Sequence, residues 1–226
     1  PLAFQDDDLI VVDKPAGLLT VPTDGGSRDD CVLARVRRDL QGLRGARAYA
    51  GALHRLDRGT SGLVAIALTP ACHAAGRAAF GRHAFTRRYL ALVEGVPPKA
   101  SGTIDLPISD EYEGGRRRVA RDDDEPARRA ITHYRVVERH QGAALLELQL
   151  ETGRQHQIRL HLRAIGHPIL GDTVYGTKER ASGGRPLLHA SHLSFAHPLS
   201  GRAISCDSPP PADFQASLAR LRRRRP

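Results

Sequence analysis

Short apolar runs, several of them alternating between two faces, predict a chain rich in β-strands. The first run is Asp8–Asp13, which leads into the turn Lys14–Gly17. In a later run Tyr89, Ala91 and Val93 share one face of a strand. Further strands are predicted at 62–68, 86–94, 131–138, 144–150, 187–196 and 202–207.

Helices are predicted over three stretches, of which the first and the last carry the apolar spacing of an amphipathic helix. They are 30–41, the stretch from Thr69 to about 82, and the stretch after 154 that ends at Gly166. Gly42 is expected to end the first of these helices. Thr69 as N-cap, followed by Pro70 at the first helical position, is a start signal for the second.

The order of these elements predicts an α+β fold with a mixed, largely antiparallel central sheet and flanking helices. Strands outnumber helices and mostly follow one another by short connections, which argues against a doubly wound fold. Residues 109–130 mix charges with few apolar anchors and are interpreted as a mobile loop. Because no linker is evident, we expect a single domain over 1–226, with 218–226 as a frayed basic tail.

Arginine gives the chain its strong positive charge. The 226 residues carry a net charge of +9, with a pI of about 10.2. A basic domain is typical of nucleic-acid binding, although a charge kept for solubility, or a GC-rich genome that raises the share of Arg and Ala, would give the same composition. No apolar run approaches a membrane span, and the first residues are acidic where a secretory signal is basic. We therefore expect a cytoplasmic protein.

Metal and nucleotide sites find no support in the sequence. The three cysteines are far apart and form no CxxC pair, so neither a zinc site nor a disulfide framework is indicated. The histidines are scattered, and the pair five residues apart, His156 and His161, lacks the i, i+4 spacing and the intervening Glu of zinc-protease helices. No Walker loop or GxGxxG follows a strand. We predict no metal and no cofactor.

Two clusters of polar residues could carry chemistry. In the first, Asp57 lies between Arg55 and Arg58 and is followed by glycines. Neighbouring guanidinium groups favour an ionised carboxylate, which suits a nucleophile or an electrostatic stabiliser better than a general acid. An ordinary ion-paired turn would look similar. The second cluster, around Arg159, is a helix face that could reach a carboxylate or a phosphate, or could simply be solvated.

These residues fall within motifs that resemble those of the RluA-type pseudouridine synthases. The motifs are DDLIVVDKPAGLLTVP, HRLDRGTSGL, RRYLALVEG, ETGRQHQIRLHLRAIGHPILGDTVYG and LLHASHLSFAHPLSG. The resemblance runs from about residue 4 to residue 214. It implies the pseudouridine synthase catalytic fold and, since the chain starts at the first catalytic motif, the absence of an N-terminal S4-like RNA-binding domain.

The resemblance implies isomerisation of uridine in RNA to pseudouridine without a cofactor. It makes Asp57 the nucleophile and places Arg55 in the RNA stack as the target base flips out. Tyr89 would pack on the base, and Arg159 would pair with the catalytic carboxylate. Polar residues of the same motifs are expected to contact RNA, and Leu160 to line the base pocket. The expected RNA contacts are His54, Arg55, Arg58, Arg154, His156 and Gln157.

Several alternatives stay open at this point. Asp57 could attack the ribose C1′ or the uracil C6, or assist loss of the 2′ proton. A nucleoside-bond hydrolase would need a second carboxylate as acid, which none of the motifs supplies. An RNA-binding module without activity would have no use for an oriented carboxylate among phosphates. We expect a monomer acting on stem-loops of ribosomal or transfer RNA.

Overall fold

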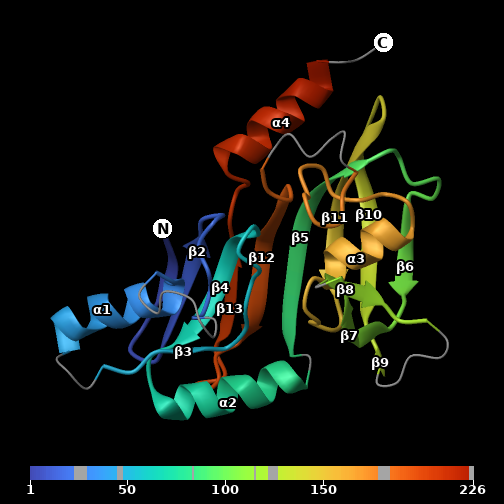
Figure 1. The fold of residues 1–226 in the computed structure, drawn as a ribbon. Coiled ribbons are helices and arrows are strands. Elements are labelled where there is room, and N and C mark those ends of the chain that lie inside the picture. The colour runs from blue at the N-terminus through green and yellow to red at the C-terminus, as the bar shows by residue number, and fades with distance from the viewer. Residues whose placement is uncertain are drawn as a thin grey trace. The chain divides into compact units, whose positions relative to one another are not determined.

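The computed structural model describes residues 1–22, 30–44, 48–82, 84–114, 116–121, 127–177 and 184–223 (Figure 1). The chain forms two compact units. Unit 1 consists of Pro1–Arg87 and Ala190–Pro209, and unit 2 consists of Arg88–His189 and Pro210–Pro226. The single domain predicted for 1–226 stays a prediction.

Unit 1 is built on a sheet with the strand order β1-β2-β4-β12, in which β13 pairs with β12 and β3 with β4. The pairs β1–β2, β2–β4, β3–β4 and β12–β13 are all antiparallel. Its elements are β1 (Leu2–Gln5), β2 (Leu9–Lys14), α1 (Val32–Arg44), β3 (Gly51–Ala52), β4 (Ser61–Ala67), α2 (Pro70–Gly81), the end of β12 (Leu188–Ala196) and β13 (Ala203–Asp207).

The core of unit 1 follows from the apolar runs. All residues of β4 are buried, and Leu9 and Val11 of β2 join them. Phe85 and Phe195 stack with their ring centroids 4.3 Å apart and extend this core. The Thr69 hydroxyl accepts a hydrogen bond from the Cys72 amide at 3.3 Å, so the predicted N-cap of α2 is confirmed.

Unit 2 contains two antiparallel sheets. The larger has the order β5-β11-β10-β6, and the smaller has the order β8-β7-β9. Helix α3 packs against β8 and β10. The elements are the larger part of β5 (Phe85–Glu94), β6 (Ser101–Asp105), β7 (Ile108–Glu113), β8 (Arg116–Val119), β9 (Ala127–Arg128), β10 (Ile131–His140), β11 (Ala143–Leu150), α3 (Gln157–Ala164) and α4 (Ala212–Arg223).

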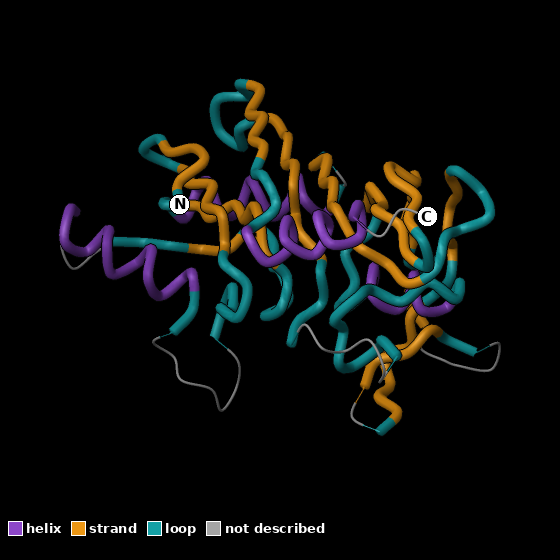
Figure 2. Tube along the Cα trace, turned by 90° about the horizontal axis from the view of Figure 1, so that it is seen from above, coloured by secondary structure: helices purple, strands orange, loops and turns teal. Residues whose placement is uncertain are grey.

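The predicted α+β class with largely antiparallel strands is confirmed, and Figure 2 shows how strands predominate over helices. The strands expected from the apolar runs are present with shifts of one or two residues at some ends. None of the helices in the described ranges combines the length and apolarity that a bilayer crossing requires.

Two helix ends differ from the predictions. Gly42 does not end α1, which continues to Arg44. The frayed tail predicted at 218–226 is wrong as far as Arg223, because α4 extends through these residues. Arg222 of α4 binds the Glu138 carboxylate through two hydrogen bonds of 2.9 and 2.5 Å, and this pair anchors the end of the helix. Residues 224–226 lie outside the described residues.

The mobile loop predicted at 109–130 is also wrong for its described part, which contains most of the smaller sheet. Opposite charges pair across these strands, as in the ion pairs of Asp110 with Arg117 and with Arg128. Ile108 and Val119, paired in register, supply apolar contacts at the base of the hairpin. The charged outer positions hid this pattern in the sequence. Residues 115 and 122–126 of the segment lie outside the described residues.

Candidate active site

Asp57 lies in unit 1, on the loop between β3 and β4. Along this loop Arg55 and Arg58 are exposed, Leu56 is buried and Asp57 is half-buried. The Asp57 carbonyl accepts a hydrogen bond from the Thr60 amide at 3.1 Å and closes a turn. The buried Leu56 therefore anchors the loop directly before Asp57, whose sequence neighbours Arg55 and Arg58 are exposed.

The loop is held on both sides of Asp57 by the segment that follows β2. The Thr20 hydroxyl donates to the Leu56 carbonyl at 2.8 Å and accepts from the Leu56 amide at 3.0 Å. The Gly17 amide donates to the Arg58 carbonyl at 2.8 Å, and the Arg58 Nε donates back to the Gly17 carbonyl at 2.9 Å. These reciprocal bonds fix the backbone position from which Asp57 projects.

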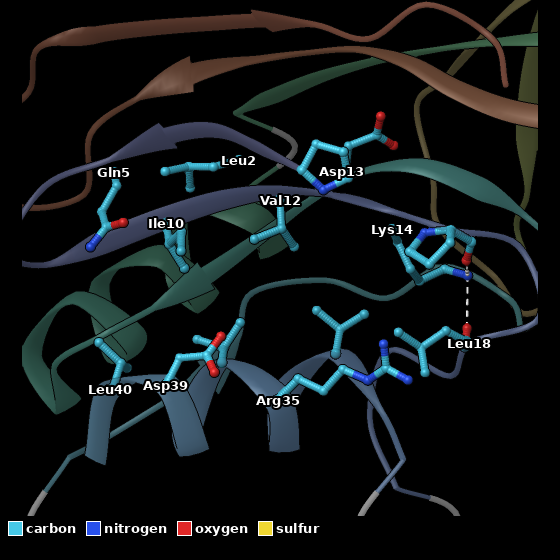
Figure 3. Close-up of a pocket in the computed structure, with 14 residues that line it drawn as sticks. Leu2, Gln5, Ile10, Val12, Asp13, Lys14, Leu18, Arg35, Asp39 and Leu40 are labelled. Carbon is cyan, nitrogen blue, oxygen red and sulfur yellow. Dashed lines mark hydrogen bonds between the residues drawn. The ribbon is translucent and has the colours of Figure 1, made fainter. Parts of the chain in front are cut away.

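Lys14 also ties the Asp57 loop to the segment that follows β2. Its side chain is fully buried, and its Nζ donates to the carbonyls of Leu18, Pro15 and Arg58 at 2.8, 3.0 and 3.3 Å. Figure 3 shows the bond to Leu18 at one end of a pocket of about 390 Å³ between α1 and the strands β1 and β2. A buried ammonium group requires such partners, because burial without them would disfavour its charge.

Gly62, at the start of β4, is required by its surroundings. Its φ is +113°, and a Cβ atom there would lie 2.2 Å from the Ala190 carbonyl oxygen. Any side chain at this position would displace the backbone directly after the Asp57 loop. The packing of Gly62 against Ala190 within unit 1 therefore explains why the predicted nucleophile motif has a glycine at this position.

His54 lies in the core of unit 1, only 6% exposed, and stacks on Phe80. Its Nε2 accepts a hydrogen bond from the Ala65 amide at 3.2 Å. Burial, with a smaller contribution from the Arg87 charge, lowers the pKa of His54 to about 3. A neutral, buried imidazole offers no charge to a phosphate, so this placement gives the predicted RNA contact no support.

In unit 2, Arg159 forms a buried ion pair with Asp172. The Arg159 Nε donates to Asp172 Oδ2 at 2.7 Å, and Nη2 donates to Oδ1 at 2.8 Å. Burial alone would raise the pKa of Asp172, but the Arg159 guanidinium and the amides of Val174 and Tyr175 hold it below its ordinary value. The fork of Arg159 is therefore fixed in orientation by a permanent anion.

Tyr175 links this ion pair to the start of α3. The guanidinium carbon of Arg159 lies 4.8 Å from the centroid of the Tyr175 ring, within cation–π distance. The Tyr175 hydroxyl is 2.9 Å from Nδ1 of His156. His156, the N-cap residue, has a φ of +57°, and within the described residues no other non-glycine residue has a positive φ.

Gln157 is a buried structural residue. Its carbonyl oxygen accepts from the Thr152 hydroxyl and the Arg154 amide, and its amide nitrogen donates to the Ile131 carbonyl and the Thr132 hydroxyl. Gln157 is 2% exposed, and these bonds satisfy both the oxygen and the nitrogen of its side-chain amide. The structure thus gives Gln157 the role of holding the turn before α3 against β10, which does not support the predicted RNA contact.

The remaining predicted residues of unit 2 are Tyr89, Leu160 and Arg154. Tyr89, on β5, is 5% exposed, and Leu160, on α3, is 4% exposed. Arg154 is exposed, with its Nε donating to the Arg129 carbonyl at 3.1 Å. Arg154 lines a pocket of about 310 Å³ together with Arg117 and Arg128.

The predicted catalytic residues are divided between the units. Asp57 belongs to unit 1, whereas Tyr89 and Arg159 belong to unit 2, so the predicted pairing of Asp57 with Arg159 stays a prediction. In the part of the chain that the structure describes, no group of three or more His, Cys, Asp or Glu side chains is arranged to hold a metal ion.

Sequence reasoning assigned no role to three residues that shape these sites. They are Lys14, Thr20 and Asp172. The sequence signal was present, because each lies within one of the quoted motifs. A motif reveals that a residue belongs to the site, but it does not reveal the partner that the side chain holds.

Comparison with known proteins identifies the family. The sequence profile of the RNA pseudouridylate synthase family matches residues 8–164. The ribosomal large subunit pseudouridine synthase D of Zymomonas mobilis is 39% identical over 225 residues, which cover 95% of this chain and 70% of the relative. The dual-specificity RNA pseudouridine synthase RluA of Escherichia coli is 39% identical over 216 residues, which cover 94% of this chain and 93% of the relative.

The solved structures give the same result. Human RNA pseudouridylate synthase domain containing 4 has a TM-score of 0.80 at 26% identity, covering 98% of this chain and 92% of that one. Fold and motifs thus define an RNA-modifying isomerase. The chain belongs to the RNA pseudouridylate synthase family, and the predicted membership is confirmed.

Proposed function

We propose that this RNA uridine isomerase converts specific uridines of structured RNA to pseudouridine with Asp57 as the nucleophile. The observation that carries the proposal is the Asp57 loop. The half-buried Asp57 lies between two exposed arginines in the sequence, and the Thr20 and Gly17 bonds fix the backbone on either side. A nucleophile needs such fixed placement, because small displacements cost large factors in rate.

The reaction breaks the C1′–N1 bond of uridine and joins C1′ to C5, so atoms balance without a co-reactant. Asp57 attacks or deprotonates the nucleotide, with the attacked atom left open. Arg159, oriented by Asp172, is proposed to pair with the Asp57 carboxylate and set its direction. Tyr89 packs on the uracil and relays the C5 proton late in the reaction.

A uridine within a stem or a stacked loop must leave the stack before Asp57 can reach it, at a cost of a few kcal/mol. Arg55, exposed beside Asp57, is proposed to fill the vacated position and offset part of this cost. Arg58, Arg154 and His156 are proposed to contact the surrounding backbone, and Leu160 to line the base pocket. We propose that the protein acts as a monomer, in which one chain supplies all of these catalytic and RNA-contacting residues.

The substrate is proposed to be a stem-loop of ribosomal RNA, transfer RNA or both. The relative from Z. mobilis is named for the large ribosomal subunit, and that from E. coli for dual specificity. The general positive charge of the chain suits either RNA. The sequence of the target loop is open.

The test is incubation of the wild-type protein with total RNA from cells that lack its gene, followed by mapping of pseudouridine and assay of free uracil. We expect new pseudouridine at one or a few positions, and the same positions modified in cells that carry the gene. Release of free uracil would instead identify a nucleoside-bond hydrolase. RNA binding with neither product would identify a binding module without activity.

A further inference from the structure

A second concave site lies in unit 2, between α3 and the smaller sheet. Its volume is about 400 Å³. The residues that the argument uses are Arg116, Arg117 and Arg118 of β8, Arg163 of α3, and the apolar Leu160 and Val119. We call it the arginine pocket. Arg159 is not among its lining residues.

The pocket has an excess of positive charge. Among the described residues that line it, four carry guanidinium groups and one, Glu113, carries a carboxylate. Nearby carboxylates balance part of this charge. Arg118 Nε lies 3.2 Å from Glu113 Oε2, and Arg117 Nη1 lies 3.1 Å from Asp110 Oδ1. These pairs explain how adjacent arginines are held in position on β8.

Two of the arginines lack such a balance. Arg163 is exposed in the last turn of α3, and within the described part of the chain its side chain forms no hydrogen bond or ion pair. Arg116 is exposed and donates to the Val174 carbonyl at 3.1 Å, and no carboxylate in the described ranges pairs with it. An arginine pair left without carboxylates on the wall of a concave site favours an anionic ligand.

The neighbouring surface has the same character. Arg117 also lines the pocket that contains Arg128 and Arg154, and a single carboxylate, that of Asp110, lies among those three arginines. The two pockets therefore adjoin at β8, and each presents more arginine than acid. Repeated anionic groups along one ligand, such as the phosphates of a nucleic acid strand, fit this repetition better than one small anion does.

We propose that the arginine pocket binds a backbone phosphate of the RNA substrate, with Arg163 and Arg116 as its donors. Guanidinium groups bind phosphate oxygens through paired N–H donors. Val119, beside the buried Leu160, gives an apolar surface on which the adjoining ribose can pack. The inference rests on the proposed function for its choice of RNA, and it adds a phosphate subsite that contributes affinity without sequence reading.

Arg163→Ala and Arg116→Ala test the site, with Arg220→Ala as the matched control. Arg220 is an exposed arginine of α4 that does not line the pocket. The probe is unfractionated transfer RNA, and its Kd is measured by filter binding from about 0.05 to 0.3 M KCl. Thermal unfolding of each variant checks that it is folded.

We expect Arg163→Ala to weaken binding about threefold to tenfold at 0.1 M KCl and to reduce the slope of log Kd against log salt by about 0.7–0.9. Arg116→Ala should act in the same direction, and Arg220→Ala should match wild type. Equal slopes and affinities for Arg163→Ala, Arg116→Ala and Arg220→Ala would overturn the inference.

The two proposals fail separately. If the wild-type protein forms no pseudouridine, the proposed function fails, whereas the salt slopes still decide whether the pocket binds phosphate. If pseudouridine forms and the Arg163 and Arg116 variants bind as the control does, only the arginine pocket is rejected.

Discussion

The side chain of Thr20 forms two hydrogen bonds with the backbone of Leu56, donating to its carbonyl at 2.8 Å and accepting from its amide at 3.0 Å. Both residues are buried. Leu56 is the residue directly before Asp57, so a hydroxyl 36 residues away determines where the predicted nucleophile sits.

Thr20→Val removes both bonds while keeping the shape of the side chain. Two buried backbone groups lose their partner, which we expect to lower the free energy of unfolding by about 1–3 kcal/mol. The freed Asp57 loop should also lower turnover about tenfold or more. Urea unfolding and pseudouridine formation measure the two effects. Thr103→Val, at an exposed position of β6, is the control, and equal behaviour of the two variants would refute this role of Thr20.

Asp172→Asn leaves Arg159 buried without an anion. We expect a loss of about 3–5 kcal/mol in the free energy of unfolding, because one charge of a buried pair is left uncompensated. Asp213→Asn is the control. Asp213 also pairs with an arginine, Arg185, but its own side chain is 53% exposed. That change should cost at most about 1 kcal/mol. Equal costs in urea unfolding would contradict the buried role of Asp172.

The same pair predicts a pH dependence. Because the pKa of Asp172 is lowered in the folded state, its stabilising contribution is complete above the pKa of an unfolded aspartate, about 3.9. It is lost as the pH falls through the lowered folded value. The difference between wild type and Asp172→Asn should therefore be constant near neutral pH and shrink only in strong acid.

His54 predicts a different pH window. Its pKa is about 3 in the folded protein and about 6.5 when unfolded, so the unfolded chain binds the extra proton between these values. Stability should therefore fall as the pH drops below about 6.5. Between pH 7 and pH 5 the wild type should lose about 2 kcal/mol more than His54→Gln. Parallel losses in urea unfolding would mean that His54 is not held neutral.

Much of the fold was predictable because apolar periodicity reports burial. The fully buried β4 and the capped α2 were found from their sequence alone. The smaller sheet was missed since its strands carry cross-strand ion pairs such as that of Asp110 with Arg117, and such charged segments look like a solvated loop. The amphipathic α4 was hidden by its run of arginines.

For the site, the motifs identified positions but not environments. Gln157 and His54 are polar residues in RNA-binding motifs, and both proved buried, because a polar side chain is stable in the core when its partners are present. Asp172 was not assigned because its partner Arg159 is 13 positions away. Such pairings depend on the tertiary fold, which a single sequence does not display.

Tyr89→Phe separates base packing from proton relay. The ring stays in place, so we expect the Kd for RNA to remain within about twofold of wild type, while the late proton transfer from C5 slows and product formation stalls. Time courses of pseudouridine formation at saturating protein measure this step. Tyr134→Phe, on β10, serves as the control. Wild-type turnover by Tyr89→Phe would remove its hydroxyl from the chemistry.

The most direct test of Asp57 as the nucleophile is the yield of pseudouridine from Asp57→Asn. We expect a loss of about a thousandfold or more with RNA affinity nearly unchanged, because the amide keeps the shape and loses the nucleophile. Asp39→Asn, an exposed carboxylate of α1, should behave as wild type. Pseudouridine formation by Asp57→Asn at the rate of Asp39→Asn, or an equal loss of binding and product, would contradict the account.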